Sequence, residues 1–251
     1  MVVSCDSIGL RQGMGRPVNI QVVKPRKEFG NTVAADVTHR LREEIISCRL
    51  KPGEPLKFEP LRASFGASFT TLREALMSLV ADGLVVMEGQ RGFHVAPATL
   101  DDLCDVTNAR VLIEVDVLRQ SIAKGDDEWE IGIMSALHRL NKIEERMSGS
   151  PVGDPKWRSA HKEFHHALVS ACGSPTLLSI RSALYDRSER YRSLSASYRP
   201  VSRDKAGEHR ALMLAAVSRD SDQAVDLIEK HIRSTTANVV KYAKDVLGPI
   251  G

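Results

Sequence analysis

Two stretches near the N-terminus, residues 34–50 and 69–83, carry apolar residues at the spacing of an amphipathic helix. The apolar residues of each stretch fall on one helix face: Val37, Leu41 and Ile45 in the first, Leu72, Leu76 and Leu79 in the second. Between the stretches lies the short segment "EPLRASFG"; Ser68 can cap the second long helix, and Gly83 can end it. The stretch "LVVMEGQRGFHVAP" then predicts two short strands around a Gly-Gln-Arg-Gly tip. The order helix, helix, tight turn, helix, hairpin is typical of a winged helix-turn-helix.

Beyond the predicted hairpin the strand signals stop and helical patterns continue. Six stretches have helical periodicity, separated by breaks such as "GSP" at 149–151 and again at 173–175. The pattern predicts a mostly α protein, with a winged helix-turn-helix over residues 31–97 and an all-α bundle of six or more helices over residues 98–251. Residues 1–30 have no sustained periodicity and contain several glycines and prolines, which predicts a flexible, mildly basic arm.

The net charge of +3 lies entirely in that arm, because residues 31–97 balance at 8 basic against 8 acidic side chains and residues 98–251 at 22 against 22. The strong basic footprint of many nucleic-acid-binding proteins is therefore missing, and DNA binding must be argued from local geometry. No apolar run approaches the ~18 residues of a membrane span. The N-terminus has no secretory pattern, and the four cysteines are scattered. These features predict a cytoplasmic protein with reduced thiols and no membrane partner.

In a winged helix the second helix of the turn enters the major groove, and the wing lies over the backbone or the minor groove. That helix, the wing tip and the start of the supporting helix supply the candidate DNA-binding residues: Lys57, Ser68, Thr70, Thr71, Arg73 and Arg91. The ordered series of turn, capped helix and Gly-x-x-Gly wing favours this interpretation. The alternative is a winged helix used for protein contact, in which Arg73 is merely solvated.

The segment "HKEFHH" at residues 161–166 places His161 and His165 one helical turn apart, where both can hold one metal ion. Zinc proteases carry H-E-x-x-H, with the glutamate directly after the first histidine. Here Lys162 follows His161. Glu163 lies about 200° around the helix from His161, so it points away from any metal held by the histidines. The segment therefore does not fit a metalloprotease.

Two further histidines, His209 and His231, lie 22 residues apart in the last two predicted helices, and the break at Asp220 is equidistant from both. An antiparallel hairpin would bring them to the same level, where they could join His161 and His165 around one metal ion. The alternative for each histidine alone is a surface or hydrogen-bonded core position. Two neighbours have other expected roles: His166 at the surface or outside the ligand set, and Cys172 in packing or as a rival ligand.

The N-terminal motifs resemble the GntR family of bacterial transcription regulators. The resemblance rests on "LREEIISCRLKPGEPL", "FGASFTTLREALMSLVADGLV" and "GQRGFHV", with Leu72–Leu76 standing where the family commonly has V-R-E-A-L. Two positions depart from the family pattern. Phe69 follows the serine of the turn where an arginine is common, and Glu59 or Pro60 stands where the supporting helix often carries another arginine.

The C-terminal part resembles the FCD subgroup of that family, whose helical bundle senses a ligand. "NARVLIEVDVLRQSIA" is similar to its R-x-x-x-E helix, and "HKEFHHALVSACGSP" to its D-x-x-F-H helix. By this resemblance His165, His209 and His231 match family metal ligands, while His161 falls where aspartate is usual. An imidazole in place of a carboxylate favours Zn²⁺ or Ni²⁺ over Mn²⁺ or Mg²⁺. Alternatively, His161 does not bind and three histidines hold the metal.

The resemblance also implies a small organic acid as effector. Arg110 is the candidate clamp for its carboxylate, since a guanidinium grips carboxylates at two points; the alternative is a structural ion pair with Glu114, one turn on. The sequence thus predicts a homodimeric, ligand-responsive regulator of double-stranded operator DNA, with a divalent metal and no enzymatic activity. Two other hypotheses remain: a metal-dependent hydrolase that uses the histidine site, and a regulator whose metal is purely structural.

Overall fold

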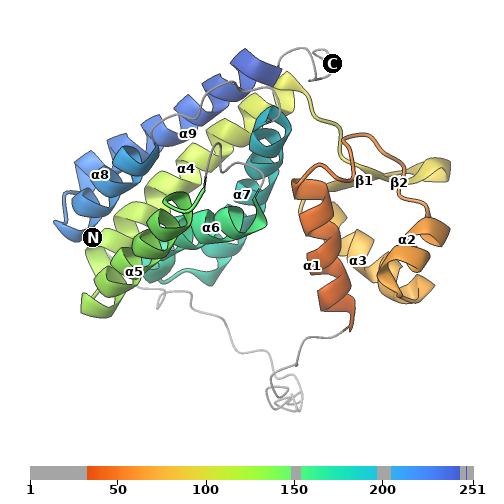
Figure 1. The fold of residues 1–251 in the computed structure, drawn as a ribbon, viewed down its shortest axis with the longest axis horizontal. Coiled ribbons are helices and arrows are strands. Elements are labelled where there is room, and N and C mark those ends of the chain that lie inside the picture. Colours follow the sequence, from red (N-terminus) through yellow and green to blue (C-terminus); the bar gives the residue numbers. More distant parts are fainter. Residues whose placement is uncertain (1–32, 148–153, 197–204, 244–246, 248–251) are drawn as a thin grey trace, which may run out of the picture.

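The computed structural model describes residues 33–147, 154–196, 205–243 and 247, which are mostly helical (Figure 1). The N-terminal part has three α-helices and one antiparallel pair of strands: α1 (Val33–Ile46), α2 (Phe58–Phe65), α3 (Phe69–Ala81), β1 (Val85–Glu88) and β2 (Gly92–Val95). The described C-terminal residues form six α-helices: α4 (Leu100–Lys124), α5 (Asp127–Glu144), α6 (Pro155–Val169), α7 (Pro175–Ala196), α8 (Lys205–Val217) and α9 (Ser221–Ala243). The predicted fold class is confirmed. The predicted arm over residues 1–30 lies outside the described residues.

In the winged helix, α1 and α3 pack through the apolar faces that their periodicity predicts. The residues with the least exposure there are Leu41, Ile45, Leu72, Leu76 and Leu79, each at 0%. Ser68 caps α3 by accepting a hydrogen bond from the backbone N–H of Thr71 at 3.1 Å. Gly66 ends α2 with a φ of 64°, a left-handed conformation that favours glycine and makes the tight turn possible. The two strands of the wing pair with Val85 opposite Val95.

The bundle is built around α4, which packs against α6, α7 and α9. Thr99, Asp126 and Asp154 cap α4, α5 and α6 by accepting backbone N–H bonds. Helix α6 ends at Val169 and is followed directly by one short 3₁₀ turn over Ser170–Cys172. No helix in the described part of the chain is long and apolar enough to cross a membrane.

Helix α7 also holds the winged helix in place. Arg190 of α7 is 1% exposed and donates to two carbonyl oxygens of the segment after β2, at 2.7 and 3.1 Å. Arg42 of α1 bridges two carboxylates, Asp186 of α7 at 3.2 Å and Asp82 at the C-terminus of α3 at 2.6 Å. A displacement of α7 would therefore act on the C-terminal end of α3 through the ion pairs from Asp186 to Arg42 and from Arg42 to Asp82.

A candidate metal centre and a candidate DNA-binding surface

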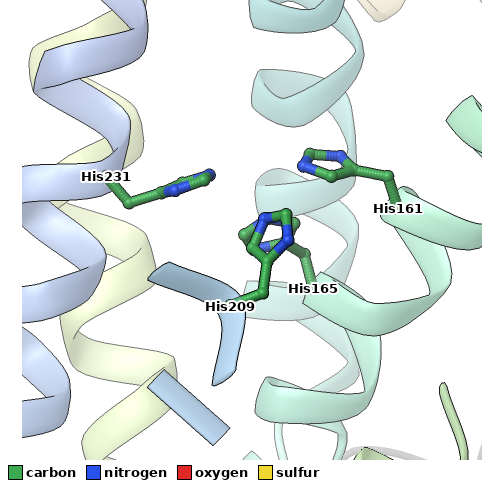
Figure 2. A group of neighbouring side chains, drawn as sticks. All are labelled: His161, His165, His209 and His231. Carbon is green, nitrogen blue, oxygen red and sulfur yellow. The ribbon is translucent and has the colours of Figure 1, made fainter. Parts of the chain in front are cut away.

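Four histidines from three helices converge inside the bundle (Figure 2). His161 and His165 lie on α6, His209 on α8 and His231 on α9, and one ligand nitrogen of each lies within 4.8 Å of those of the others. All four are buried, with at most 7% exposure, and their rings point toward a common centre in Figure 2. Four imidazoles at this spacing have the ligand type and number of a Zn²⁺ or Ni²⁺ site.

The hairpin of α8 and α9 brings the two most distant histidines side by side. Arg219 takes a φ of 62° in the turn, and the Asp220 carboxylate accepts a hydrogen bond from the backbone N–H of Gln223 at 3.0 Å as α9 begins. The ring centroids of His209 and His231 are 5.1 Å apart. The symmetry of the two histidines about the turn thus gives the pairing that their spacing predicts.

Two of the four rings are oriented by a second polar group outside the cluster. The Nδ1 atom of His161 lies 2.7 Å from the hydroxyl of Tyr185, and the Nδ1 atom of His231 lies 2.8 Å from a carboxylate oxygen of Glu208. Such outer hydrogen bonds fix the ring orientation and tautomer of a metal ligand. They assign Nε2 as the nitrogen with which each of these rings would coordinate a metal.

His165 provides the sharpest test of whether the residues fit a metal. Its side chain is 1% exposed, and among the described residues neither ring nitrogen has a hydrogen-bond partner. Burial, with the neighbouring His231 and His209 adding to it, holds the pKa of His165 well below its usual range. The ring is therefore neutral, as a metal ligand must be. A buried polar atom left without a partner costs free energy that coordination would recover. The residues fit a metal.

A charged network lies next to the histidines and involves Arg110. Its Nε donates to one Glu114 oxygen at 3.3 Å, and Arg181 of α7 donates to the other at 3.0 Å. Arg181 also donates to the backbone carbonyl of His165 at 2.9 Å. Burial alone would raise the pKa of the Glu114 carboxyl, but the two guanidinium groups lower it overall. The ion pair that was the alternative for Arg110 is present.

Arg110 also faces the histidines across a small cavity. The cavity has a volume of about 10 Å³, and its lining includes Arg110, Arg192, His161 and His231. Such a volume holds roughly one water molecule. Arg192 pairs with the carboxylate of Glu189 and lies over the ring of Trp157 at 4.5 Å. Two guanidinium groups thus border the same space as two of the candidate metal ligands.

Three neighbours of the motif lie outside the cluster. Glu163 is exposed and pairs with Arg139 at 3.0 Å, pointing away from the histidines as its helical angle predicts. His166 is exposed, and the Cys172 thiol is buried in the apolar core of the bundle. Glu163 is therefore not placed like the base of a zinc protease.

The sequence interpretation missed four polar residues around the site: Tyr185, Arg181, Arg192 and Glu208. A signal for three of them exists in "RSALYDRSERYR", where six of the twelve residues are charged and α7 has no apolar face. Such a helix in the interior of a bundle must pair its charges internally. Glu208 stands next to His209 and has no comparable signal.

The candidate DNA-binding residues are exposed or half-buried at the surface of the winged helix. Ser68 and Thr71 are both engaged in the cap of α3: the Ser68 hydroxyl accepts from the backbone N–H of Thr71, and the two hydroxyl oxygens lie 2.8 Å apart. Thr70 and Arg73 are exposed on the first turns of α3, and among the described residues Arg73 has no hydrogen-bond or ion-pair partner. Lys57 is exposed just before α2. Arg91 lies at the wing tip with a side chain that is 82% exposed, and its Nη1 atom is 3.5 Å from Oε2 of Glu88. The structure thus leaves three cations accessible to a phosphate backbone.

Comparison with known proteins agrees with both halves of this architecture. Residues 33–95 match the family described as bacterial regulatory proteins, gntR family, and residues 105–234 match the FCD domain. The HTH-type transcriptional regulator BphR of Paraburkholderia xenovorans (strain LB400) is 41% identical over 81% of this chain and 83% of its own. The HTH-type transcriptional repressor GlaR of Escherichia coli (strain K12) is 34% identical over 76% and 89%. The structure of E. coli McbR/YncC shares the fold, with a TM-score of 0.72, 19% identity and coverage of 84% and 98%. The chain therefore belongs to the GntR family of bacterial transcription regulators and carries an FCD domain.

Proposed function

We propose that this regulator binds operator DNA through residues 31–97 and senses a small organic acid through a divalent metal in residues 98–251, where it also dimerises. The observation that carries the sensing half is the buried histidine cluster, whose proposed ligands are His161, His165, His209 and His231. The chemistry of four imidazoles favours Zn²⁺ or Ni²⁺. When bound, the metal would supply a Lewis-acid anchor for a carboxylate oxygen, and a metal-dependent hydrolase or a purely structural metal remains the alternative.

The carboxylate is proposed to lie in the small cavity between the histidines and the arginines. Arg110 and Arg192 border that cavity, and each guanidinium could hold a carboxylate at two points by exchanging a present partner for the acid. At about 10 Å³ the cavity holds roughly one water in this conformation, so the acid must widen it. The Glu189 carboxylate, which now pairs with Arg192, is the group that a bound acid would compete with.

The signal is proposed to travel along α7. This helix carries Tyr185, which contacts His161, and Ser188, which accepts a hydrogen bond from Arg110 at 2.9 Å. Asp186, on the same helix, is ion-paired with Arg42 of the winged helix. Widening the cavity moves α7, and the ion pair passes that movement to α3.

The sensing half is tested by the melting temperature of the metal-loaded protein in a panel of short mono- and dicarboxylic acids. The matching acid is expected to raise it by roughly 5–10 °C at 100 times its Kd. Chelated protein should not respond, because the metal anchor is absent. Arg110→Lys keeps the charge but loses the two-point grip, so it should weaken the response.

Two outcomes favour the alternatives. If no acid changes the melting temperature but chelation lowers it, the metal is structural. Turnover of ester or phosphoester substrates by the loaded protein, lost in His209→Ala, would favour the hydrolase.

The DNA-binding half predicts different effects for two arginines. Arg73→Ala should weaken specific operator binding by roughly 1–3 kcal/mol. Its side chain is exposed on the first turns of α3, which supports the proposed base contact. Arg91→Ala should weaken binding to all sequences equally and lower the salt slope by about one, as expected for one phosphate contact. Gel shifts at several salt concentrations, with specific and scrambled duplexes, measure both. Equal effects of the two variants on both duplexes would contradict the assignment.

A further inference from the structure

The first residue of α3, Phe69, is a large apolar side chain that is 51% exposed. One side of its ring packs on Phe58, with the ring centroids 4.2 Å apart and the planes 34° from each other. Phe58 in turn meets Phe93 of the wing edge to face, at 6.0 Å and 82°. The three rings connect α2, α3 and β2, so the ring of Phe69 is supported from beneath while its outer side remains open.

The position of Phe69 on α3 indicates what covers that open side. The N-terminal residues of the second helix of a helix-turn-helix are those that reach base edges in the major groove. Thr70 is exposed next to Phe69, and Arg73 is exposed one turn further on the same face. An exposed ring beside a cation without a partner among the described residues suits a polyanion with apolar groups on its surface, which describes the major groove of DNA.

A phenyl ring has no hydrogen-bond donor and accepts weakly, so it cannot read the polar groups of a base pair. The major groove presents one apolar feature that differs between bases, the 5-methyl group of thymine. A ring held in one orientation by Phe58 loses little conformational freedom when a methyl group packs on it, which favours binding.

We propose that Phe69 is a specificity-determining residue that selects thymine by contact with its 5-methyl group at one position of the operator site. The proposal rests on the operator binding proposed above. It adds a preference for thymine that the contacts of the cationic residues do not provide. Arg73 and the hydroxyl of Thr70 supply the polar contacts, and Phe69 supplies the apolar contact.

The test uses the full-length, metal-loaded protein and a library of random duplex DNA. After selection and sequencing, each thymine of the selected site is replaced in turn by deoxyuridine, which lacks only the methyl group. At one position the wild-type protein should bind the deoxyuridine duplex roughly fourfold more weakly, as loss of one buried methyl group predicts. Phe69→Ala should bind the two duplexes equally, and Phe69→Leu, which retains an apolar side chain, should keep part of the difference.

Met77→Ala is the matched control, since Met77 is also apolar and 42% exposed on α3 but lies two turns further along. It should retain the fourfold difference. Circular dichroism of each variant shows whether the winged helix is folded. The proposal is overturned if deoxyuridine has no effect at any position, or if Phe69→Ala keeps the difference that the wild type shows. If the wild-type protein selects no sequence at all, the proposed operator binding fails, and the proposal fails with it.

Discussion

The His209→Ala and His231→Ala proteins are expected to lose their divalent ion. Each substitution removes one of the four converging imidazoles from the interior of the bundle, where water cannot easily replace it. Removal of an outer hydrogen-bond partner alone costs about 10–100-fold in metal affinity, so loss of a ligand should cost at least about 100-fold. Elemental analysis of protein never exposed to chelator, followed by titration of Zn²⁺ and Ni²⁺ into the chelated protein, measures this. About one ion per wild-type chain is expected.

Two further variants sharpen the result. His166→Ala changes the exposed neighbour of His165 and should keep the ion, which controls for a general effect of losing a histidine from α6. His161→Ala separates a four-histidine site from a three-histidine site, because the loss of a ligand should lower the metal affinity by at least about 100-fold, whereas the loss of a bystander should leave the affinity unchanged. Wild-type protein without any metal would remove the site, and full occupancy in both His209→Ala and His231→Ala would show that the ion is bound elsewhere.

The Glu114→Gln protein is expected to lose about 3–5 kcal/mol of its free energy of unfolding, as is typical when one partner of a buried ion pair is removed. Glu114 is 1% exposed and lies between Arg110 and Arg181. The amide retains the shape of the side chain but leaves two buried guanidinium groups without their counter-charge. Urea denaturation of metal-loaded protein at neutral pH measures the change.

The pH dependence of this contribution follows from the direction of the pKa shift. Because the folded protein lowers the pKa of Glu114, the stabilisation is fully present above the pKa of the unfolded chain, about 4. It is lost as the pH falls through the lower folded value. Glu145→Gln removes the acidic partner of an exposed pair with Lys142. It is the matched control and should leave the midpoint of urea denaturation unchanged. An unchanged midpoint for Glu114→Gln as well would contradict the role of the buried pair.

The local structure could be predicted from the sequence because it depends on residues close together in the chain. The apolar spacing of α1 and α3 and the cap at Ser68 define the winged helix without knowledge of any distant contact. The same holds for two pairs of histidines. His161 and His165 share a face because a helix repeats every 3.6 residues, and His209 and His231 pair because Asp220 lies midway between them.

Only the tertiary structure decided which pairs meet and what surrounds them. Periodicity shows that a helix has a buried face but not which other helix covers it. Without the family resemblance, the approach of α6 to the hairpin of α8 and α9 could therefore not be predicted. Tertiary packing also decided that Tyr185 and Glu208 contact the histidines and that Phe58 supports Phe69. A polar side chain changes its chemistry when packing excludes water from it, and that exclusion depends on the whole bundle. Arg110 shows this directly: the sequence allowed both a clamp and an ion pair with Glu114, and burial beside Arg181 made the ion pair.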